Sequence, residues 1–212
     1  MERLPRGRHG LSPDFVAKNQ RERLLTALAE SLYERGYEKT TVAAIGKRAA
    51  VSKSDFYKHF ESKEACFLAA YDDAVERIRE HVLSPCDQRG SWEERVLASL
   101  ASLLAFLAEK PALARLVLVE GLRAGRGVFD RYQDALQSFV PFLREGAPAP
   151  PGAPRPPEAT DEAVVGGVAA LLSRHALGDE LDRLGEFLPE IGEFVLTPYL
   201  GAAEARRIIS ER

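Results

Sequence analysis

The sequence has little cysteine or histidine, and this scarcity argues against several classes of enzyme. It contains 2 Cys and 4 His among 212 residues, and the His are scattered without the H-E-x-x-H spacing of a zinc site. Glu76, Arg79 and His81 share a predicted helix but lack the E-x-x-H spacing of bundle metal sites. Gly-rich phosphate loops and G-x-S-x-G nucleophile motifs are also absent. We therefore expect no enzymatic activity, no cofactor and no metal; an enzyme built on a helical bundle is the disfavoured alternative.

Long apolar runs and targeting signals are equally scarce. The longest apolar-rich run, Ala98 to Ala108, is too short to cross a bilayer, and no signal-peptide pattern occurs. A cytoplasmic protein without membrane contact is expected, with Cys66 and Cys86 reduced. Cys66 lies in an apolar helical pattern and is predicted to be a core residue. Cys86 follows Pro85 in a predicted loop, and a redox switch is disfavoured because nothing nearby clearly lowers a thiol pKa.

Charge is unevenly divided along the chain. Overall, 45% hydrophobic and 29% charged residues are typical of a globular protein, and the net charge is −3. Residues 1–63 hold 13 Lys and Arg against 8 Asp and Glu, whereas residues 64–212 hold 16 against 24. A basic N-terminal part joined to an acidic remainder is the asymmetry expected when only the first part contacts nucleic-acid phosphates.

Residues 41–63, TVAAIGKRAAVSKSDFYKHFESK, have the pattern of two short helices joined by a tight turn. Thr41 is a predicted cap for the first helix, and Ser52 for the second, with Asp55 three residues later as in a capping box. Phe56 and Phe60 stand four residues apart on one face of the second helix. A helix that buries two Phe and presents Lys, Ser and Tyr to solvent suits the major groove of DNA. This is a helix-turn-helix pattern.

The polar side chains around this pattern are the candidates for DNA contact. Lys53 and Ser54, early in the second helix, are expected to touch bases, while Thr41 and Lys63 are expected to fix register through phosphates. The alternative for His59 is a cap at the helix end, and for Tyr57 a half-buried packing position. The full predicted set is Thr41, Ser52, Lys53, Ser54, Tyr57, Lys58, His59 and Lys63.

The same stretch resembles the tetracycline-repressor (TetR) family of bacterial regulators. The resemblance rests on Gly36-Tyr37, Thr40-Thr41-Val42, Ile45, Ala49, Val51-Ser52, Phe56-Tyr57, His59-Phe60 and Ser62-Lys63-Glu64. Two positions depart from the family pattern. Ala50 stands where the turn usually has Gly, so a left-handed backbone is less favourable there. Ala44 stands where a carboxylate often completes the first capping box.

The resemblance implies an all-α protein of about nine helices in two domains. Residues 1–63 would hold an N-terminal arm and a three-helix DNA-binding domain, and residues 64–212 a helical domain for ligand binding and dimerisation. Apolar spacing and caps predict helices from Ser12 to Gly36, from Ser62 to Leu83, from Ser91 onward, and over 113–122, 128–143, 158–177 and 184–196. The Pro-rich residues 146–157 are predicted to be a loop, with a recognition peptide as the less favoured reading. Basic residues 1–11 are either a disordered terminus or an arm that contacts DNA.

The resemblance also implies a function. The family's members are dimeric regulators, so we expect a homodimer that binds a near-palindromic double-stranded operator. We expect it to act as a repressor and to be released from the operator by a small molecule. The last two long helices would form the dimer, with Gly166, Gly167, Phe187, Ile191 and Phe194 at the contact. An apolar or aromatic effector is expected, and aromatic and polar residues of the second domain are the candidates for its binding site. The alternative for the aromatic residues is that they are core residues, and for the polar residues that they are solvated. The candidate set is Phe106, Glu120, Arg123, Arg126, Phe129, Tyr132, Phe139 and His175. A DNA-binding regulator controlled by a partner protein, or by nothing, is the alternative.

Overall fold

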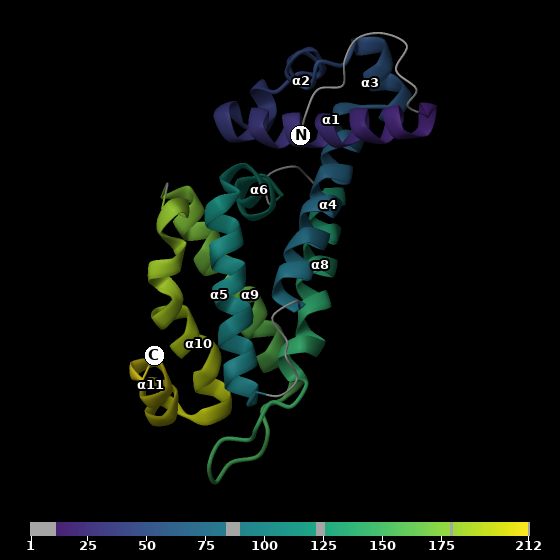
Figure 1. Cartoon of the computed structure of the whole chain (residues 1–212). Coiled ribbons are helices and arrows are strands. Elements are labelled where there is room, and N and C mark those ends of the chain that lie inside the picture. The colour runs from purple at the N-terminus through teal and green to yellow at the C-terminus, as the bar shows by residue number, and fades with distance from the viewer. Residues whose placement is uncertain (1–11, 84–89, 122–125, 179, 212) are drawn as a thin grey trace. The chain divides into compact units, whose positions relative to one another are not determined.

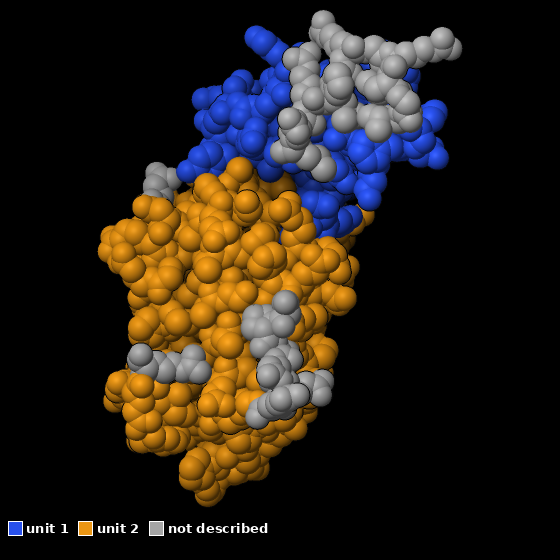
Figure 2. Space-filling model, viewed as in Figure 1, with its two compact units in different colours: residues 1–74 blue, residues 75–212 orange. Residues whose placement is uncertain are grey.

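The computed structural model describes residues 12–83, 90–121, 126–178 and 180–211, and every regular element in these ranges is a helix. The all-α prediction is therefore confirmed. The chain divides into two compact units, residues 1–74 and residues 75–212, which Figure 2 shows in blue and orange. Each unit is described by itself below. The predicted N-terminal arm and Cys86 lie outside the described residues.

Unit 1 contains three helices and the beginning of a fourth. The helices are α1 (Pro13–Lys39), α2 (Val42–Ala49), α3 (Lys53–His59) and α4 (Lys63–Leu83), the last of which continues into unit 2. Figure 1 shows α2 and α3 as short helices beside the long α1. α1 packs on α2, and α2 packs on α3. Three elements of this order are the minimum that a helix-turn-helix domain requires.

Each helix of unit 1 begins at a hydroxyl side chain that accepts a backbone N–H. The acceptors are Oγ of Ser12 for Phe15 N (3.2 Å), Oγ1 of Thr41 for Ala44 N (3.2 Å), Oγ of Ser52 for Asp55 N (3.0 Å) and Oγ of Ser62 for Ala65 N (3.0 Å). Caps of this kind satisfy N–H groups that have no partner within the helix. All four caps were predicted from the sequence, and all four are confirmed.

A bend near its C-terminal end interrupts α1. Gly36 has φ 73° and ψ 172°, a backbone conformation that residues with a Cβ rarely adopt. The helix continues past it to Lys39. The Thr40 hydroxyl donates to the Gly36 carbonyl at 2.8 Å, and the Thr40 N–H donates to the Tyr37 carbonyl at 3.2 Å. The helix was predicted to end at Gly36; the structure has a bend there instead, and helical residues follow it to Lys39.

The core of unit 1 is formed by apolar side chains at helical spacing. Leu24, Leu28 and Leu32 of α1 have no exposed surface, and neither do Ile45 of α2 and Phe56 of α3. Burying a side chain of this size stabilises a fold by about 1.5–3 kcal/mol. Cys66 is also fully buried, as predicted, and burial raises the pKa of its thiol to about 12. A thiol held protonated in this way is unreactive at neutral pH.

Unit 2 is a helical bundle around α5. Its elements are α5 (Trp92–Glu109), α6 (Pro111–Arg115), the π-helix η1 (Leu116–Glu120), α8 (Arg126–Arg144), α9 (Glu158–Leu177), the 3₁₀ helix η2 (Leu181–Phe187), α10 (Leu188–Leu200) and α11 (Ala202–Ser210). α5 packs against η2 and α10, while α9 packs against α8 and α10 (Figure 1). The buried side chains of α5 include Trp92, Leu97 and Leu104.

Several element bounds in unit 2 differ from the prediction. The single helix expected over 113–122 is α6 followed by the π-helix, whose five residues are all buried and therefore give no amphipathic signal of the change. The final helix was expected over 184–196, but the chain forms η2, then α10 to Leu200, then α11 after Gly201. The described residues thus contain ten α-helices, against about nine expected. The loop prediction for 146–157 is confirmed.

A buried polar cluster joins four helices of unit 2. The Tyr199 hydroxyl donates to Asp161 Oδ1 at 2.5 Å, and Arg144 Nη1 lies 2.6 Å from Asp161 Oδ2. The Trp92 ring stands 4.8 Å from the Tyr199 ring, and its Nε1–H donates to the Leu143 carbonyl at 2.9 Å. Asp161 is 1% exposed, so its charge is compensated by partners rather than by water.

Within the described residues, each helix taken singly is too short or too polar to cross a bilayer. The pair Trp92–Glu109 and Pro111–Glu120 passes by length and composition alone, with a bend of 104° at its break. Buried core helices commonly have the same composition, and α5 is largely buried in the bundle.

Candidate nucleic-acid interface

The second helix of the pair, α3, has one buried face and one exposed face. Phe56 is 0% exposed and the following Phe60 is 5% exposed, whereas Tyr57 is 49% exposed. Lys53, Ser54 and Lys58 are exposed beside Tyr57. The exposed face therefore carries two cations, a hydroxyl and a phenol, which are groups that bind phosphates and base edges.

Polar contacts fix the first turn of α3. The Ser52 Oγ accepts the Asp55 N–H and lies 2.8 Å from both Asp55 Oδ2 and Ser54 Oγ. Lys58 Nζ donates to Asp55 Oδ1 at 2.7 Å. The Lys58 ammonium, and secondly the Ser52 hydroxyl, hold the pKa of the Asp55 carboxyl below its usual value. Because the Lys58 side chain is 74% exposed, this ion pair contributes little to stability.

The turn between α2 and α3 has the left-handed conformation that the sequence makes unfavourable. Ala50 has φ 51° and ψ 44°. Among the described residues it is the one residue other than glycine with a positive φ. The Val51 N–H donates to the Gly46 carbonyl at 2.9 Å, which closes the turn. A Cβ on Gly46 would lie 2.8 Å from the Val51 carbonyl oxygen, so the close approach requires glycine at this position.

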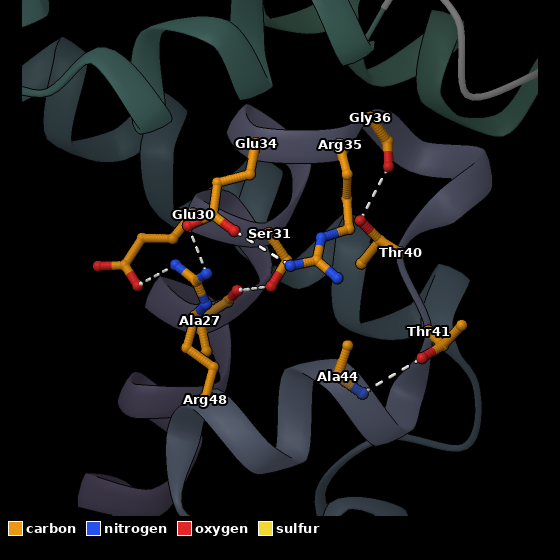
Figure 3. A network of polar contacts seen from close by, with 10 residues as sticks. All are labelled: Ala27, Glu30, Ser31, Glu34, Arg35, Gly36, Thr40, Thr41, Ala44 and Arg48. Carbon is orange, nitrogen blue, oxygen red and sulfur yellow. Dashed lines mark hydrogen bonds and ion pairs between the residues drawn. The ribbon is translucent and has the colours of Figure 1, made fainter.

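An arginine of α2 ties the helix pair to α1. Arg48 Nη1 lies 3.1 Å from Glu30 Oε2, its Nη2 pairs with Glu34, and Arg35 pairs with Glu34 at 3.1 Å. Figure 3 shows Arg48 reaching the two carboxylates, and the Thr41 cap at the opposite end of α2. The hydrogen bond from Arg48, and then that from Arg35, lower the pKa of the Glu34 carboxyl. This contact was not predicted from the sequence, because its residues lie 14 and 18 positions apart.

His59 faces α1. Its Nε2 lies 3.1 Å from Gln20 Oε1, and the ring is half-buried. Arg21, next to Gln20, stacks over the Phe60 ring at 5.2 Å from the centroid. Burial lowers the pKa of His59, so the imidazole is neutral at pH 7. These contacts hold the end of α3 against α1, and DNA contact by His59 stays a prediction.

Lys63 at the start of α4 is half-buried and is bound by its own chain. Its Nζ donates to the Tyr37 carbonyl at 2.9 Å and to the Thr40 carbonyl at 3.1 Å, and lies 3.9 Å from the Tyr37 ring centroid. Two of the three N–H groups of the ammonium are therefore used inside unit 1. Phosphate contact by Lys63 stays a prediction, and the geometry gives the residue a second role that is considered below.

The predicted effector residues are distributed over four elements of unit 2. The Phe106 ring of α5 stacks on His81 at 3.9 Å, and the His175 ring of α9 stacks on Phe187 at 3.7 Å, with Nδ1 2.7 Å from Glu180. On α8, Phe129 is 49% exposed, while Tyr132 and Phe139 are half-buried. Glu120 is buried in η1. Arg123 lies outside the described residues, and Arg126 begins α8. Phe106 and His175 thus pack on residues outside the predicted set.

The predicted dimer residues divide into an open group and a buried group. A Cβ on Gly166 would meet nothing within 4 Å, and Phe194 is 40% exposed. At Gly167, by contrast, a Cβ would meet the Phe194 ring at 2.5 Å, so this glycine fits α9 to α10 within one protomer. Ile191 has no exposed surface, which corrects its predicted place at a contact with a second copy. Phe187 stacks on His175.

The helices α2 and α3 are short, begin at side-chain caps and are joined by a left-handed turn, and α1 packs on α2. This arrangement is a helix-turn-helix DNA-binding domain. Residues 24–70 match the model of the bacterial regulatory proteins of the tetR family. Residues 24–70 therefore have the sequence of this family's DNA-binding domain, and the resemblance noted in the sequence is confirmed for this stretch.

Known relatives agree with this assignment. An uncharacterized HTH-type transcriptional regulator of Lactococcus lactis subsp. lactis is 32% identical over 93 residues, which cover 44% of this chain and 46% of the relative. The fatty acid degradation regulator FadR of Bacillus halodurans has a similar structure, with TM-score 0.73, 17% identity, and coverage of 84% and 94% of the two chains. FadR of Bacillus subtilis, solved with stearoyl-CoA, has TM-score 0.67, 15% identity, and coverage of 85% and 98%. This chain spans about half the length of the first curated relatives it matches.

Proposed function

We propose that this regulator is a homodimeric repressor that binds a near-palindromic operator through α2 and α3 and leaves it when a small, mainly apolar molecule binds unit 2. Two copies of one reading helix related by a two-fold axis would bind two half-sites about one helical turn, or a multiple of it, apart. The proposed DNA contacts are Thr41, Ser52, Lys53, Ser54, Tyr57, Lys58 and His59. Lys63 was also predicted to contact DNA, but its ammonium is bound to two carbonyls of unit 1, and we assign it a different role in the next subsection.

The observation that supports DNA binding best is the division of α3 into two faces. The adjacent aromatic residues Phe56 and Tyr57 are 0% and 49% exposed, so an aromatic ring that the core does not need points outward between Lys53 and Lys58. An exposed tyrosine flanked by cations is of little use to stability. It suits a helix that contacts a phosphate backbone and base edges.

Selection of random duplexes by the purified protein tests this proposal. One near-palindromic sequence should be enriched, and Lys53→Ala should relax the preference at one of its positions. Tyr57→Ala should weaken binding to that duplex with little change in unfolding. Lys110→Ala is the matched control, because Lys110 is an exposed lysine of unit 2 and its loss should leave the affinity unchanged. Failure to enrich any sequence would refute the proposal.

The dimer proposal is supported by the open surface around Gly166 and Phe194. Gly166→Leu adds a large side chain where the protomer has room, so the protomer should fold, while a second copy should no longer approach closely. Sedimentation of this variant should show a shift from dimer to monomer. Gly185→Leu is the control: a Cβ there also meets nothing within 4 Å, but Gly185 lies in η2. An unchanged dimer in Gly166→Leu would move the contact elsewhere.

For the effector, long-chain acyl-CoA is the first class to test. The support is the likeness of the fold to FadR, whose structure was solved with stearoyl-CoA, together with the apolar composition of α5 and η1. Titration of stearoyl-CoA into the complex of protein and selected duplex should release the DNA, while CoA alone should not. If acyl-CoA and a panel of apolar metabolites all fail, the alternative of control by a partner protein, or of no control, is favoured. A promoter fusion in cells then distinguishes repression from activation.

A further inference from the structure

Lys63 lies where the end of α1, the start of α2 and the start of α4 meet, and its ammonium donates to two carbonyls within unit 1. We propose that Lys63 is a positioning residue for operator recognition, which fixes the end of α1 and the start of α2 against the first turn of α4. This inference rests on the proposed function for its effect on DNA. Its structural part, the fixation of the junction, stands independently.

The two acceptors of Lys63 are carbonyls at the end of a helix. Tyr37 and Thr40 follow the bend at Gly36, at the C-terminal end of α1. The Tyr37 carbonyl accepts the Thr40 N–H at 3.2 Å as well as the Lys63 ammonium. A lysine ammonium is a favourable partner for such carbonyls, because the C-terminal end of a helix carries partial negative charge. Lys63 thus supplies both carbonyls with a cationic donor from another helix.

The Tyr37 ring extends this contact along α4. The ammonium lies 3.9 Å from the ring centroid, within the range of a cation–π interaction. The same ring meets the Phe67 ring edge-to-face at 5.4 Å. Lys63 and Phe67 stand four residues apart and therefore share one face of α4. The end of α1 is consequently held by two side chains of α4, one through charge and one through its ring.

The position of α2 depends on this junction. Thr40, whose carbonyl Lys63 binds, is directly followed by Thr41, the residue that caps α2. Only one residue separates the bound carbonyl from the first residue of α2, Val42. Loss of the ammonium would release both carbonyls from α4 and allow α2, and α3 beyond it, to shift. Base contacts tolerate such a shift poorly, whereas non-specific contacts with phosphates tolerate it well.

Substitution by methionine separates positioning from direct phosphate contact. Lys63→Met keeps an unbranched apolar stem and removes the charge. Its affinity for the selected operator should fall by about tenfold or more, as for lost hydrogen bonds to a charged group. Its affinity for a random duplex, and the slope of that affinity against salt, should stay unchanged. Lys58→Met, which removes an exposed cation of α3, should instead lower both affinities and reduce the salt slope by about 0.9.

A second measurement needs no DNA. In Lys63→Met, amide hydrogen exchange of Thr40 and Ala44 should be faster, because both N–H groups belong to the junction. Exchange of Asp55 N–H, capped by Ser52, should not change. Lys63→Arg, which keeps the charge and donors that reach the same carbonyls, should restore part of the protection. Tyr37→Leu should also speed the exchange of Thr40 and Ala44. In the double variant with Lys63→Met, the increase in exchange rate should be smaller than the two separate increases together.

The outcomes decide between the two roles. Equal loss of operator and random-duplex affinity, with normal exchange at Thr40, would overturn the inference and make Lys63 a phosphate contact. A lower melting temperature with full operator affinity of the folded protein would also overturn it, because the role would then be structural only. If Lys63→Met does not fold, the same comparisons are made with Tyr37→Leu. Absence of any selected operator, with faster exchange at the junction, would reject the proposed function and keep the fixation of the junction.

Discussion

Unit 1 and unit 2 differ in how polar groups fix the backbone. In unit 1 the helix starts at Ser12, Thr41, Ser52 and Ser62 are each capped by a hydroxyl that acts on a residue three positions later. In unit 2, α5 is capped in this way by Ser91, whereas α6, α9, α10 and α11 begin without a side-chain cap. The buried polar contacts of unit 2 join distant positions: Trp92 reaches Leu143 across 51 residues, and Tyr199 reaches Asp161 across 38. The helix starts of unit 1 are therefore specified by the local sequence, although Lys63 reaches Tyr37 across 26 residues, whereas most helix starts of unit 2 depend on packing.

This difference has a consequence for function. A DNA-reading element must keep one geometry, and local caps together with contacts such as Lys63 to Tyr37 provide it over a short stretch of chain. A bundle whose buried polar groups join distant helices is sensitive to small shifts between those helices. Such sensitivity suits a unit proposed to respond to a ligand.

The largest expected effect is that of removing the Phe56 ring. Phe56 is fully buried and lies 5.7 Å from the Phe60 ring, so Phe56→Ala should cost about 3–5 kcal/mol of unfolding free energy. Urea unfolding followed by circular dichroism should show an early transition of unit 1. Trp92, the single tryptophan of the chain, reports unit 2 by fluorescence, and its transition should shift much less.

Tyr57→Ala is the control for this substitution. It removes the neighbouring ring, which is 49% exposed, and should cost less than about 1 kcal/mol. If Phe56→Ala shifts the urea midpoint measured by Trp92 fluorescence as much as the midpoint measured by circular dichroism, the two units unfold as one. The difference between them then lies in their sequences and not in their stabilities.

The corresponding test in unit 2 is Tyr199→Phe. This change removes the hydroxyl that donates to Asp161 at 2.5 Å and leaves the ring in place, so it should cost about 2 kcal/mol. The urea midpoint by Trp92 fluorescence should fall, because the two rings are 4.8 Å apart, while operator affinity of the folded protein should not change. Tyr132→Phe, a half-buried position on α8, is the control and should shift the midpoint less.

The same hydroxyl predicts a dependence on alkaline pH. Burial, and secondly the hydrogen bond to Asp161, raise the pKa of Tyr199 above its ordinary value of 10.0. The unfolded chain would therefore lose this proton at lower pH than the folded chain does. The resulting stability is present below pH 10.0 and is lost as the pH rises above it. In Tyr199→Phe the decline of the Trp92 midpoint above that pH should be shallower than in the wild type.

How much the sequence could predict follows the same division. Thr41 and Ser52 were found because a cap depends on a residue type and a spacing of three, both visible in the chain. Phe56 and Phe60 were found because helical periodicity separates a buried from an exposed face. The bonds of His59 to Gln20 and of Lys63 to Tyr37 were missed, since their partners are 39 and 26 residues away.

In unit 2 the missed features have other physical causes. The π-helix at Leu116–Glu120 is buried on all sides, so apolar spacing does not distinguish it from an α-helix. Ile191 was placed at a dimer contact from a resemblance, but its burial depends on how α10 packs against α5 and α9. The polar cluster of Asp161, Arg144 and Tyr199 had no motif that could have shown it.

A smaller effect of opposite sign is expected in the turn of unit 1. Ala50→Gly relieves the left-handed conformation of an exposed residue, so it should stabilise unit 1 by about 1 kcal/mol. Thermal unfolding by circular dichroism measures the change. Gly46→Ala, four residues earlier, is the matched control, because its Cβ would lie 2.8 Å from the Val51 carbonyl oxygen and should destabilise the unit. A loss of stability in Ala50→Gly would mean that the Ala50 methyl group contributes contacts that outweigh the strain.

The smallest effect concerns His59 and acidic pH. Burial lowers the pKa of His59 below its ordinary value of 6.5, with Arg21 and Lys58 acting in the same direction and Asp55 against it. The unfolded chain therefore binds this proton at higher pH than the folded chain, and the stability involved is present above pH 6.5 and is lost as the pH falls below it. His59→Gln keeps a group that hydrogen-bonds Gln20 and should cost less than about 1 kcal/mol at neutral pH. Its urea midpoint by circular dichroism should fall less than that of the wild type between about pH 7.5 and about pH 5.5. Equal declines in the two proteins would show that another group controls the acid sensitivity of unit 1, and that the end of α3 is held by Phe60 and Arg21 rather than by His59.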